Sequence, residues 1–166
     1  PMSVHDAMVY ARRRLETSGV SEAPLEAEVL LRHVLNLVDR ASYFSLTDLS
    51  LTPQQQENLE GLLIRREQRE PIPYILQRRE FYGITLEVSP AVLIPRPETE
   101  GLVDEALRWI ENRSRFGKLV TVVDVGVGSG CIAIALAHHS VAETIYGTDV
   151  SFAAIEIATR NLHRYG

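Results

Sequence analysis

Two aspartates and a run of alternating glycines are the residues of this sequence best suited to hold a nucleotide-like ligand. Asp124 lies near the end of the β-branched apolar segment 119–125, and Asp149 ends a second such segment, 143–149. Glycine at every second position between them permits a sharp turn and lets a ligand approach the backbone closely. These glycines are Gly126, Gly128 and Gly130. Asp149 follows Gly130 by 19 residues, where nucleotide-binding folds place a carboxylate that accepts the ribose hydroxyls.

The elements that must position these residues are two parallel strands joined by a helix. The apolar pattern predicts a buried strand over 119–125, a helix from Cys131, a strand over 143–149 and a helix after Asp149. A helix predicted over 98–112 comes before them. A sheet of this class normally has about five strands or more. We therefore expect this chain to be the front part of a longer protein.

Residues 1–70 are predicted to form a small helical bundle. Ser3 with Asp6, and Thr52-Pro53 with Gln55, have the spacing of helix N-terminal caps. Apolar residues recur at helical spacing over 3–18 and 24–38, the second of these including Val38. The helix that starts after Thr52 is expected to bury its apolar residues, which are Leu59, Leu62, Leu63 and Ile64.

Pro71-Ile72-Pro73 breaks the helical pattern and marks a domain boundary. Beyond it, residues 74–76 and 81–82 are strand-like and residues 84–88 alternate between apolar and polar side chains. The alternation predicts a β-hairpin over 73–89. The predicted organisation is an α/β protein with a helical bundle over 1–70, a β-hairpin linker over 71–89 and an incomplete Rossmann-like domain over 90–166.

The composition argues against several classes of protein. The 166 residues carry a net charge of −5, so direct nucleic-acid binding is not expected. The single cysteine excludes an internal disulfide and fits a reducing compartment. No apolar run reaches the roughly 18–20 residues of a membrane span, and the N-terminus lacks a signal-peptide pattern. We expect a soluble, cytoplasmic protein that is monomeric.

The other reactive side chains are predicted to be structural. Cys131 follows the glycine turn directly and is expected to be a core residue. His138 and His139 are adjacent, so they face different sides of a helix and form a poor metal pair. We expect no metal site. The basic run 12–14 is interpreted as a solvated helix face, with contact to a partner as the alternative.

The Gly-x-Gly-x-Gly turn by itself leaves two classes of ligand open. One is a nicotinamide or flavin dinucleotide, and the other is S-adenosylmethionine. The helix predicted over 98–112, before the first strand, and the Gly-x-Gly-x-Gly form of the turn favour the methyl donor.

Three motifs together are similar to those of a known enzyme family. They are Ile94-Pro95-Arg96-Pro97-Glu98-Thr99-Glu100, Asp124-Val125-Gly126-Val127-Gly128-Ser129-Gly130, and Asp149. With Pro73-Tyr74-Ile75-Leu76 and Glu80-Phe81-Tyr82-Gly83 in the linker, they resemble the HemK/PrmC family of release-factor glutamine methyltransferases. Two departures are visible: Val127 replaces a usual Thr and removes a hydroxyl near the cofactor, and Gln77 stands where Gly is common.

The resemblance implies methyl transfer from S-adenosylmethionine to the glutamine amide in the Gly-Gly-Gln motif of class I peptide chain release factors. By this resemblance, Asp149 would accept the ribose hydroxyls, and Asp124 would help to organise the glycine turn and the cofactor's amino group. The helical domain would recognise the substrate. The methionine end of the cofactor would lie on Gly126, Val127, Gly128, Ser129 and Gly130, and the active-site mouth would be lined by Arg96, Glu98 and Thr99. The family's catalytic Asn-Pro-Pro-Tyr motif is absent from these 166 residues, so the chain alone is predicted to be inactive, with no catalytic residue of its own.

Two rival functions remain open from the sequence. The first is an amino-methyltransferase that acts on a nucleobase. It stays open because such enzymes use the same Asn-Pro-Pro-Tyr motif. The second is a non-catalytic binding module in which the α/β part is a degenerate remnant. The lack of a basic patch counts against the first, and the intact glycines with Asp149 count against the second.

Overall fold

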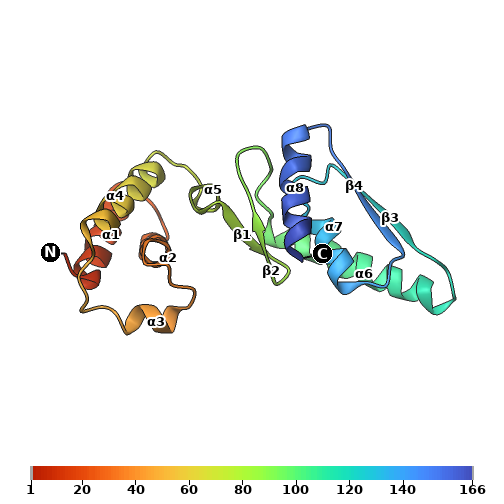
Figure 1. The fold of residues 1–166 in the computed structure, drawn as a ribbon, viewed down its shortest axis with the longest axis horizontal. Helices are drawn as coiled ribbons and strands as arrows, with labels where there is room; N and C mark the ends of the chain where they lie inside the picture. The colour runs from red at the N-terminus through yellow and green to blue at the C-terminus, as the bar shows by residue number, and fades with distance from the viewer. Residues whose placement is uncertain (1, 166) are drawn as a thin grey trace. The chain divides into compact units, whose positions relative to one another are not determined.

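The computed structural model describes residues 2–165, which form two compact units that meet between Leu76 and Gln77. The regular elements of the first unit are helices, and the second unit contains a β-hairpin and a parallel α/β arrangement (Figure 1). The predicted fold class is therefore confirmed. The division lies inside the segment 71–89 that was predicted as a linker, and the domain limits at residues 70 and 89 stay predictions.

The described residues of the helical unit form five helices. They are α1 (Val4–Thr17), α2 (Ala23–Val34), α3 (Arg40–Phe44), α4 (Pro53–Glu67) and α5 (Ile72–Leu76). Of these, α1, α3 and α4 begin at a residue whose side chain caps the helix. The Ser3 hydroxyl accepts the Asp6 amide at 3.0 Å, and the Thr52 hydroxyl accepts the Gln55 amide at 3.2 Å. In both caps the side chain three residues on also bonds back to the cap. Both predicted helix starts are confirmed.

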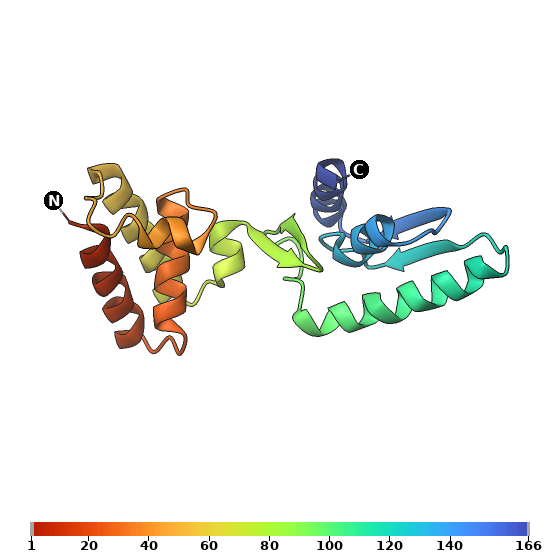
Figure 2. The same ribbon diagram turned by 90° about the horizontal axis from the view of Figure 1, so that it is seen from below.

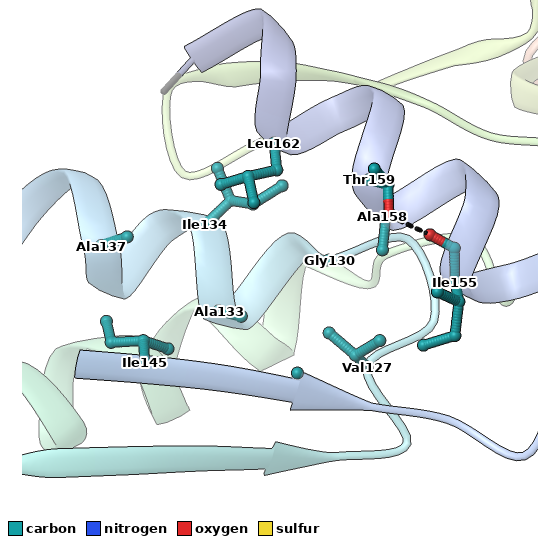
Figure 3. A pocket seen from close by; sticks show the side chains of 11 residues that line it. Val127, Gly130, Ala133, Ile134, Ala137, Ile145, Ile155, Ala158, Thr159 and Leu162 are labelled. Atoms are coloured by element: carbon teal, nitrogen blue, oxygen red, sulfur yellow. Dashed lines mark hydrogen bonds between the residues drawn. The ribbon is translucent and has the colours of Figure 1, made fainter.

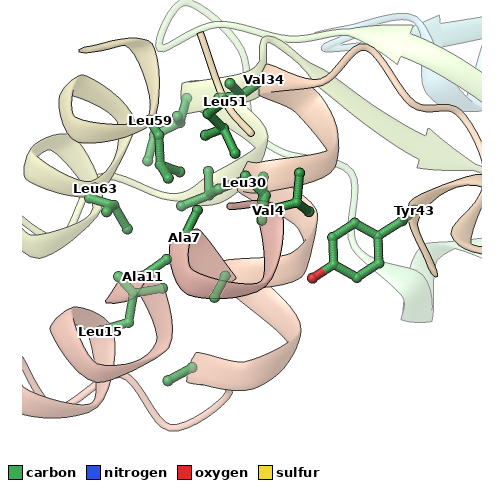
Figure 4. Packing of buried hydrophobic residues seen from close by; sticks show 14 of the residues in the cluster. Val4, Ala7, Ala11, Leu15, Leu30, Val34, Tyr43, Leu51, Leu59 and Leu63 are labelled. Carbon is green, nitrogen blue, oxygen red and sulfur yellow. The ribbon is translucent and has the colours of Figure 1, made fainter. Parts of the chain in front are cut away.

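The core of this unit lies where α1, α2 and α4 pack together. Figure 4 shows the side chains that meet there, including Leu15, Leu30 and Leu63, which are fully buried. One prediction of burial and one of helix length were wrong. Ile64 is 43% exposed because it follows Leu63 and therefore points about 100° away around the helix. Val38 is 91% exposed because α2 ends at Val34 and no helical face continues that far.

Ion pairs join the helices of this unit across its surface. The Arg14 guanidinium binds the carboxylates of Glu60 and Glu67, each at 2.6 Å, and so links α1 to α4. Arg12 pairs with Glu16 on its own helix at 2.6 Å. The run 12–14 is thus only partly a solvated face, since Arg14 is one of the contacts that hold two helices together.

The segment after Pro71 differs from the prediction. Residues 72–76 form the short helix α5, because the amides of Tyr74 and Ile75 both donate to the Pro71 carbonyl, at 3.0 and 3.1 Å. The predicted hairpin is shorter, with β1 (Arg78–Phe81) antiparallel to β2 (Ile84–Glu87). Its two-residue turn has positive φ at both positions, 50° at Tyr82 and 75° at Gly83, as type I′ hairpin turns require.

The rest of the second unit alternates helices and parallel strands as predicted. After the 3₁₀ turn η1 (Pro97–Thr99), its elements are α6 (Glu100–Arg115), β3 (Thr121–Val125), α7 (Cys131–His139), β4 (Thr144–Thr148) and α8 (Phe152–Tyr165). Strands β3 and β4 pair in parallel, with Thr121 opposite Thr144 and Val125 opposite Thr148. Figure 2 shows the same elements from a second direction.

One face of the β3–β4 sheet is covered and the other is exposed. Helix α7 contacts both strands and also packs against α6 and α8, and the strand residues Val122 and Asp124 are half-buried. On the other face, Val123 is 55% exposed, Val125 82% and Tyr146 57%. The prediction of a buried strand over 119–125 was therefore wrong for this face, because no layer of the described residues covers it.

Candidate functional site

The glycine turn leaves β3 and is tied at once to the neighbouring strand. Its three glycines have positive φ, 79° at Gly126, 54° at Gly128 and 85° at Gly130, a backbone conformation that side chains with a Cβ rarely adopt. The amides of Gly126 and Val127 both donate to the Thr148 carbonyl at 2.8 Å. The turn therefore lies at the carboxyl ends of two adjacent parallel strands, where α/β folds bind ligands.

The glycines are needed for two different reasons. A Cβ on Gly126 would meet no atom within 4 Å, and one on Gly128 would meet only the Gly126 carbonyl at 4.0 Å. This part of the turn faces open space, so a ligand can approach the bare backbone. A Cβ on Gly130 would instead lie 2.9 Å from the Ile134 side chain. Gly130 is therefore a packing requirement at the start of α7.

Asp124 holds the start of α7. Its Oδ2 accepts the Ala133 amide at 3.2 Å and so caps a helix whose own N-cap residue, Gly130, has no side chain. Burial raises the pKa of the Asp124 carboxyl, and the nearby charge of Asp149 adds to the rise. Asp124 therefore helps to hold the start of α7, and its role toward a cofactor stays a prediction.

Asp149 holds both the glycine turn and the turn that follows β4. Its Oδ2 accepts the Gly128 amide at 3.0 Å and its Oδ1 accepts the Ser151 amide at 2.9 Å. The Ser151 amide, and to a smaller extent the Gly128 amide, hold the pKa of the Asp149 carboxyl below its ordinary value. A carboxylate has about four acceptor positions, so two remain for the hydroxyls of a ligand.

The side chains of Val127 and Ser129 are turned away from this open space. Val127 is 6% exposed and packs on Gly147 of β4, and Figure 3 shows it facing an apolar pocket between β4, α7 and α8. The pocket has a volume of about 150 Å³. Ser129 is 1% exposed. Both side chains are thus buried among the described residues, and the departure at Val127 lies beside an apolar pocket.

The proline-rich loop before α6 is fixed by its backbone and by Glu100. Thr99 donates its amide to the Arg96 carbonyl at 3.0 Å, and the Glu100 carboxylate accepts the Tyr82 amide at 2.9 Å. The Arg96 and Glu98 side chains are exposed and Thr99 is half-buried. Among the described contacts, no hydrogen bond joins these three side chains to the glycine turn. The role of Glu100 was not predicted.

The structure also describes the remaining reactive side chains. Burial raises the pKa of the Cys131 thiol, which keeps it in the unreactive protonated form. His138 and His139 stack edge to face with ring centroids 5.1 Å apart. Within residues 2–165 there is no group of three or more His, Cys, Asp or Glu side chains placed to hold a metal ion, and no helix with the length and apolarity to cross a membrane.

The whole chain is similar to known methyltransferases. The family model described as "PrmC N-terminal domain" matches residues 6–76, and the model described as "Ribosomal protein L11 methyltransferase (PrmA)" matches residues 103–166. A release factor glutamine methyltransferase of Geobacter sulfurreducens is 41% identical over 99% of this chain and 55% of the relative. Enzymes of the same name from Koribacter versatilis and Coxiella burnetii are each 39% identical, over 98% and 99% of this chain and 56% and 57% of their own lengths.

The chain spans about half the length of the curated relatives it matches. The first family model covers the helical unit, and the second begins inside α6 and includes both strands of the sheet. Residues 6–76 thus match the PrmC N-terminal domain, and the chain is similar over nearly its whole length to release factor glutamine methyltransferases.

Proposed function

We propose that the polypeptide containing this chain transfers a methyl group from S-adenosylmethionine to a glutamine side-chain amide in class I peptide chain release factors, at the Gly-Gly-Gln motif. The observation that carries the proposal is the combination of an open glycine turn with Asp149 beside it. The names of the relatives support the release factor as substrate. We also propose that the protein acts as a monomer in the cytoplasm and that the helical unit contacts the release factor.

The residues present fit such a cofactor. Asp149 has acceptor capacity left for the ribose hydroxyls after binding the amides of Gly128 and Ser151. Gly126 and Gly128 leave room for the amino-acid end to lie against the backbone. Asp124 keeps α7 starting at this turn, and a helix start favours a carboxylate. When bound, S-adenosylmethionine supplies an electrophilic methyl group on its sulfonium.

The chemistry of the step depends on positioning. The glutamine amide nitrogen must approach the methyl group in line, and holding two reactants in that geometry can supply much of the rate acceleration. Arg96, Glu98 and Thr99 are proposed to line the mouth through which the substrate enters. The Asn-Pro-Pro-Tyr motif of the family is not present in this chain, so we expect residues 1–166 alone to have no methyltransferase activity.

The decisive experiment follows a labelled methyl group from S-adenosylmethionine. The full polypeptide that carries this sequence is incubated with a release factor, with the same factor in which the Gly-Gly-Gln glutamine is replaced by alanine, and with DNA and RNA. We expect label in the unaltered release factor alone. Label in nucleic acid would support the nucleobase rival, and no transfer to any substrate would support the binding module.

Asp149→Ala tests the cofactor assignment separately. Losing a charge-assisted hydrogen bond worth about 1.5–3 kcal/mol should raise the dissociation constant of S-adenosylmethionine roughly 10- to 100-fold, measured by calorimetry. Asp104→Ala is the matched control, because it removes the same charge from the same unit at a position whose described hydrogen bond comes from the Tyr82 hydroxyl. Equal affinities for the two variants would exclude the ribose assignment.

A further inference from the structure

Asn161 of α8 is a buried polar side chain whose contacts reach the glycine turn. It is 1% exposed, and its neighbours on the buried face of α8, Ala154 and Ile157, are apolar. Its Nδ2 donates to the Ser129 carbonyl at 2.8 Å and to the Glu87 carbonyl at 2.9 Å. Its Oδ1 accepts the Glu87 amide at 2.7 Å. Asn161 thus joins three segments that are distant in sequence.

Other side chains also attach α8 to β2 but do not touch the turn. The Tyr165 hydroxyl accepts the Thr85 amide and donates to the Thr85 carbonyl, both at 2.7 Å. Arg160 pairs with the Glu87 carboxylate at 2.8 Å. Attachment of α8 to the hairpin therefore does not depend on Asn161 alone, whereas among the described side-chain hydrogen bonds the one to the Ser129 carbonyl comes from Asn161.

The hydrogen bond from Asn161 to the Ser129 carbonyl also affects the peptide unit that follows it. The peptide unit is planar, so an anchored Ser129 carbonyl also orients the Gly130 amide. That amide donates to the Val127 carbonyl at 2.8 Å and closes the turn. The Gly128 amide, which binds Asp149 at 3.0 Å, lies inside the same closed segment. Without Asn161 the buried Ser129 carbonyl would lose its partner, and the turn would have to move to find another.

We infer that Asn161 is a positioning residue, which sets the glycine turn in the geometry that binds the cofactor without touching the cofactor itself. The inference rests on the proposed function for the identity of the ligand. A role confined to packing α8 on the hairpin would give Asn161 and Tyr165 equivalent effects. A positioning role separates them, because only the Asn161 contact extends to the turn.

The experiment compares Asn161→Ala with Tyr165→Phe in the full polypeptide that carries this sequence. Amide hydrogen exchange at Gly128 and Gly130 is measured without ligand, and the dissociation constant of S-adenosylmethionine is measured by calorimetry. For Asn161→Ala we expect about tenfold faster exchange at both glycines and about tenfold weaker binding. For Tyr165→Phe we expect both quantities within about twofold of the unaltered protein. Similar changes in both variants would overturn the inference.

Asn161→Asp serves if the alanine variant does not fold. It retains an oxygen to accept the Glu87 amide but loses both donated bonds, so the hairpin contact is partly kept while the turn is released. Faster exchange at Gly128 and Gly130 supports the inference, and unchanged exchange overturns it. The exchange readout needs no cofactor. Failure of the unaltered protein to bind S-adenosylmethionine would therefore count against the proposed function. Hydrogen exchange alone would then decide whether Asn161 orders the glycine turn.

Discussion

The helical unit has a closed apolar core between its helices, whereas the α/β unit leaves one whole face of its two-stranded sheet exposed. Leu15, Leu30 and Leu63 have no exposed surface in the first unit, while Val125 is 82% exposed in the second. The difference has a physical origin. A helix satisfies its backbone hydrogen bonds internally and needs only one apolar stripe covered. A parallel strand needs neighbours at both edges and cover on both faces.

The two units also use charge differently. In the helical unit, cations pair with carboxylates, as Arg14 does with Glu60 and Glu67. At the glycine turn, Asp124 and Asp149 accept backbone amides, and none of the described ion pairs includes them. The first arrangement holds helices together, and the second holds a loop in a shape. The comparison teaches that the α/β unit uses two partly buried carboxylates to hold the glycine turn and the helix that follows it.

The largest expected effect is the difference in stability loss between truncating a buried side chain of the helical unit and an exposed one of the α/β unit. Leu63→Ala should lower the free energy of unfolding by about 3 kcal/mol, because it opens a cavity in the helical core. Val125→Ala should change it by less than about 0.5 kcal/mol. Urea unfolding followed by circular dichroism measures both, and Trp109, the single tryptophan, reports on the α/β unit by fluorescence. Ile64→Ala on the same helix is the control for Leu63, and comparable losses at these two positions would contradict the described core.

The next effect tests packing inside the α/β unit. Gly147→Ala should destabilise this unit by about 1–3 kcal/mol, because the new Cβ would lie 2.7 Å from Val127 Cγ2. The Trp109 fluorescence transition should move to lower urea concentration. Adding Val127→Ala removes the clashing atoms and should restore part of the loss. A double variant no more stable than Gly147→Ala would show that the two residues do not compete for one space.

A smaller effect tests the ion pairs of the helical unit. Arg14→Met keeps much of the aliphatic stem but removes the charge that links α1 to α4, and it should cost about 1 kcal/mol because the pairs are only partly buried. The loss should shrink at high salt, where partly exposed charges are screened. Arg12→Met, which breaks a pair within α1, is the control and should have a smaller effect. A loss that is independent of salt would point to packing of the stem.

The smallest effect is the order in which the two site carboxyls titrate. The pKa of Asp124 should lie above the ordinary value of 3.8 because the group is buried, and that of Asp149 should lie below it because two backbone amides bind its charged form. The contribution of Asp149 to stability is present above pH 3.8 and is lost as the pH falls through its lower folded pKa. Carboxyl carbon chemical shifts measured against pH give both values. The reverse order would contradict the described hydrogen bonds.

The sequence predicted local structure well and tertiary burial less well. The caps at Ser3 and Thr52 are local, because each involves residues three apart. The wrong predictions at Val38 and Ile64 arose because periodicity does not say where a helix ends or which residues its partners cover. The strand predicted at residues 74–76 became α5 because bonds to the Pro71 carbonyl form a helical turn. Apolar composition could not distinguish these outcomes.

For the site, the sequence by itself determined the glycine turn, its place between two parallel strands, and the two acids beside it. These features can be read from the sequence because the strand end, the glycines and the helix start follow one another directly along the chain. Only the tertiary structure decided what each group contacts. In the folded structure a Cβ on Gly130 would clash with Ile134, and the Val127 side chain lines an apolar pocket. Asn161, which lies 32 residues further along the chain, donates a hydrogen bond to the Ser129 carbonyl. Contacts of this kind depend on how helices pack on strands, and no local pattern records that.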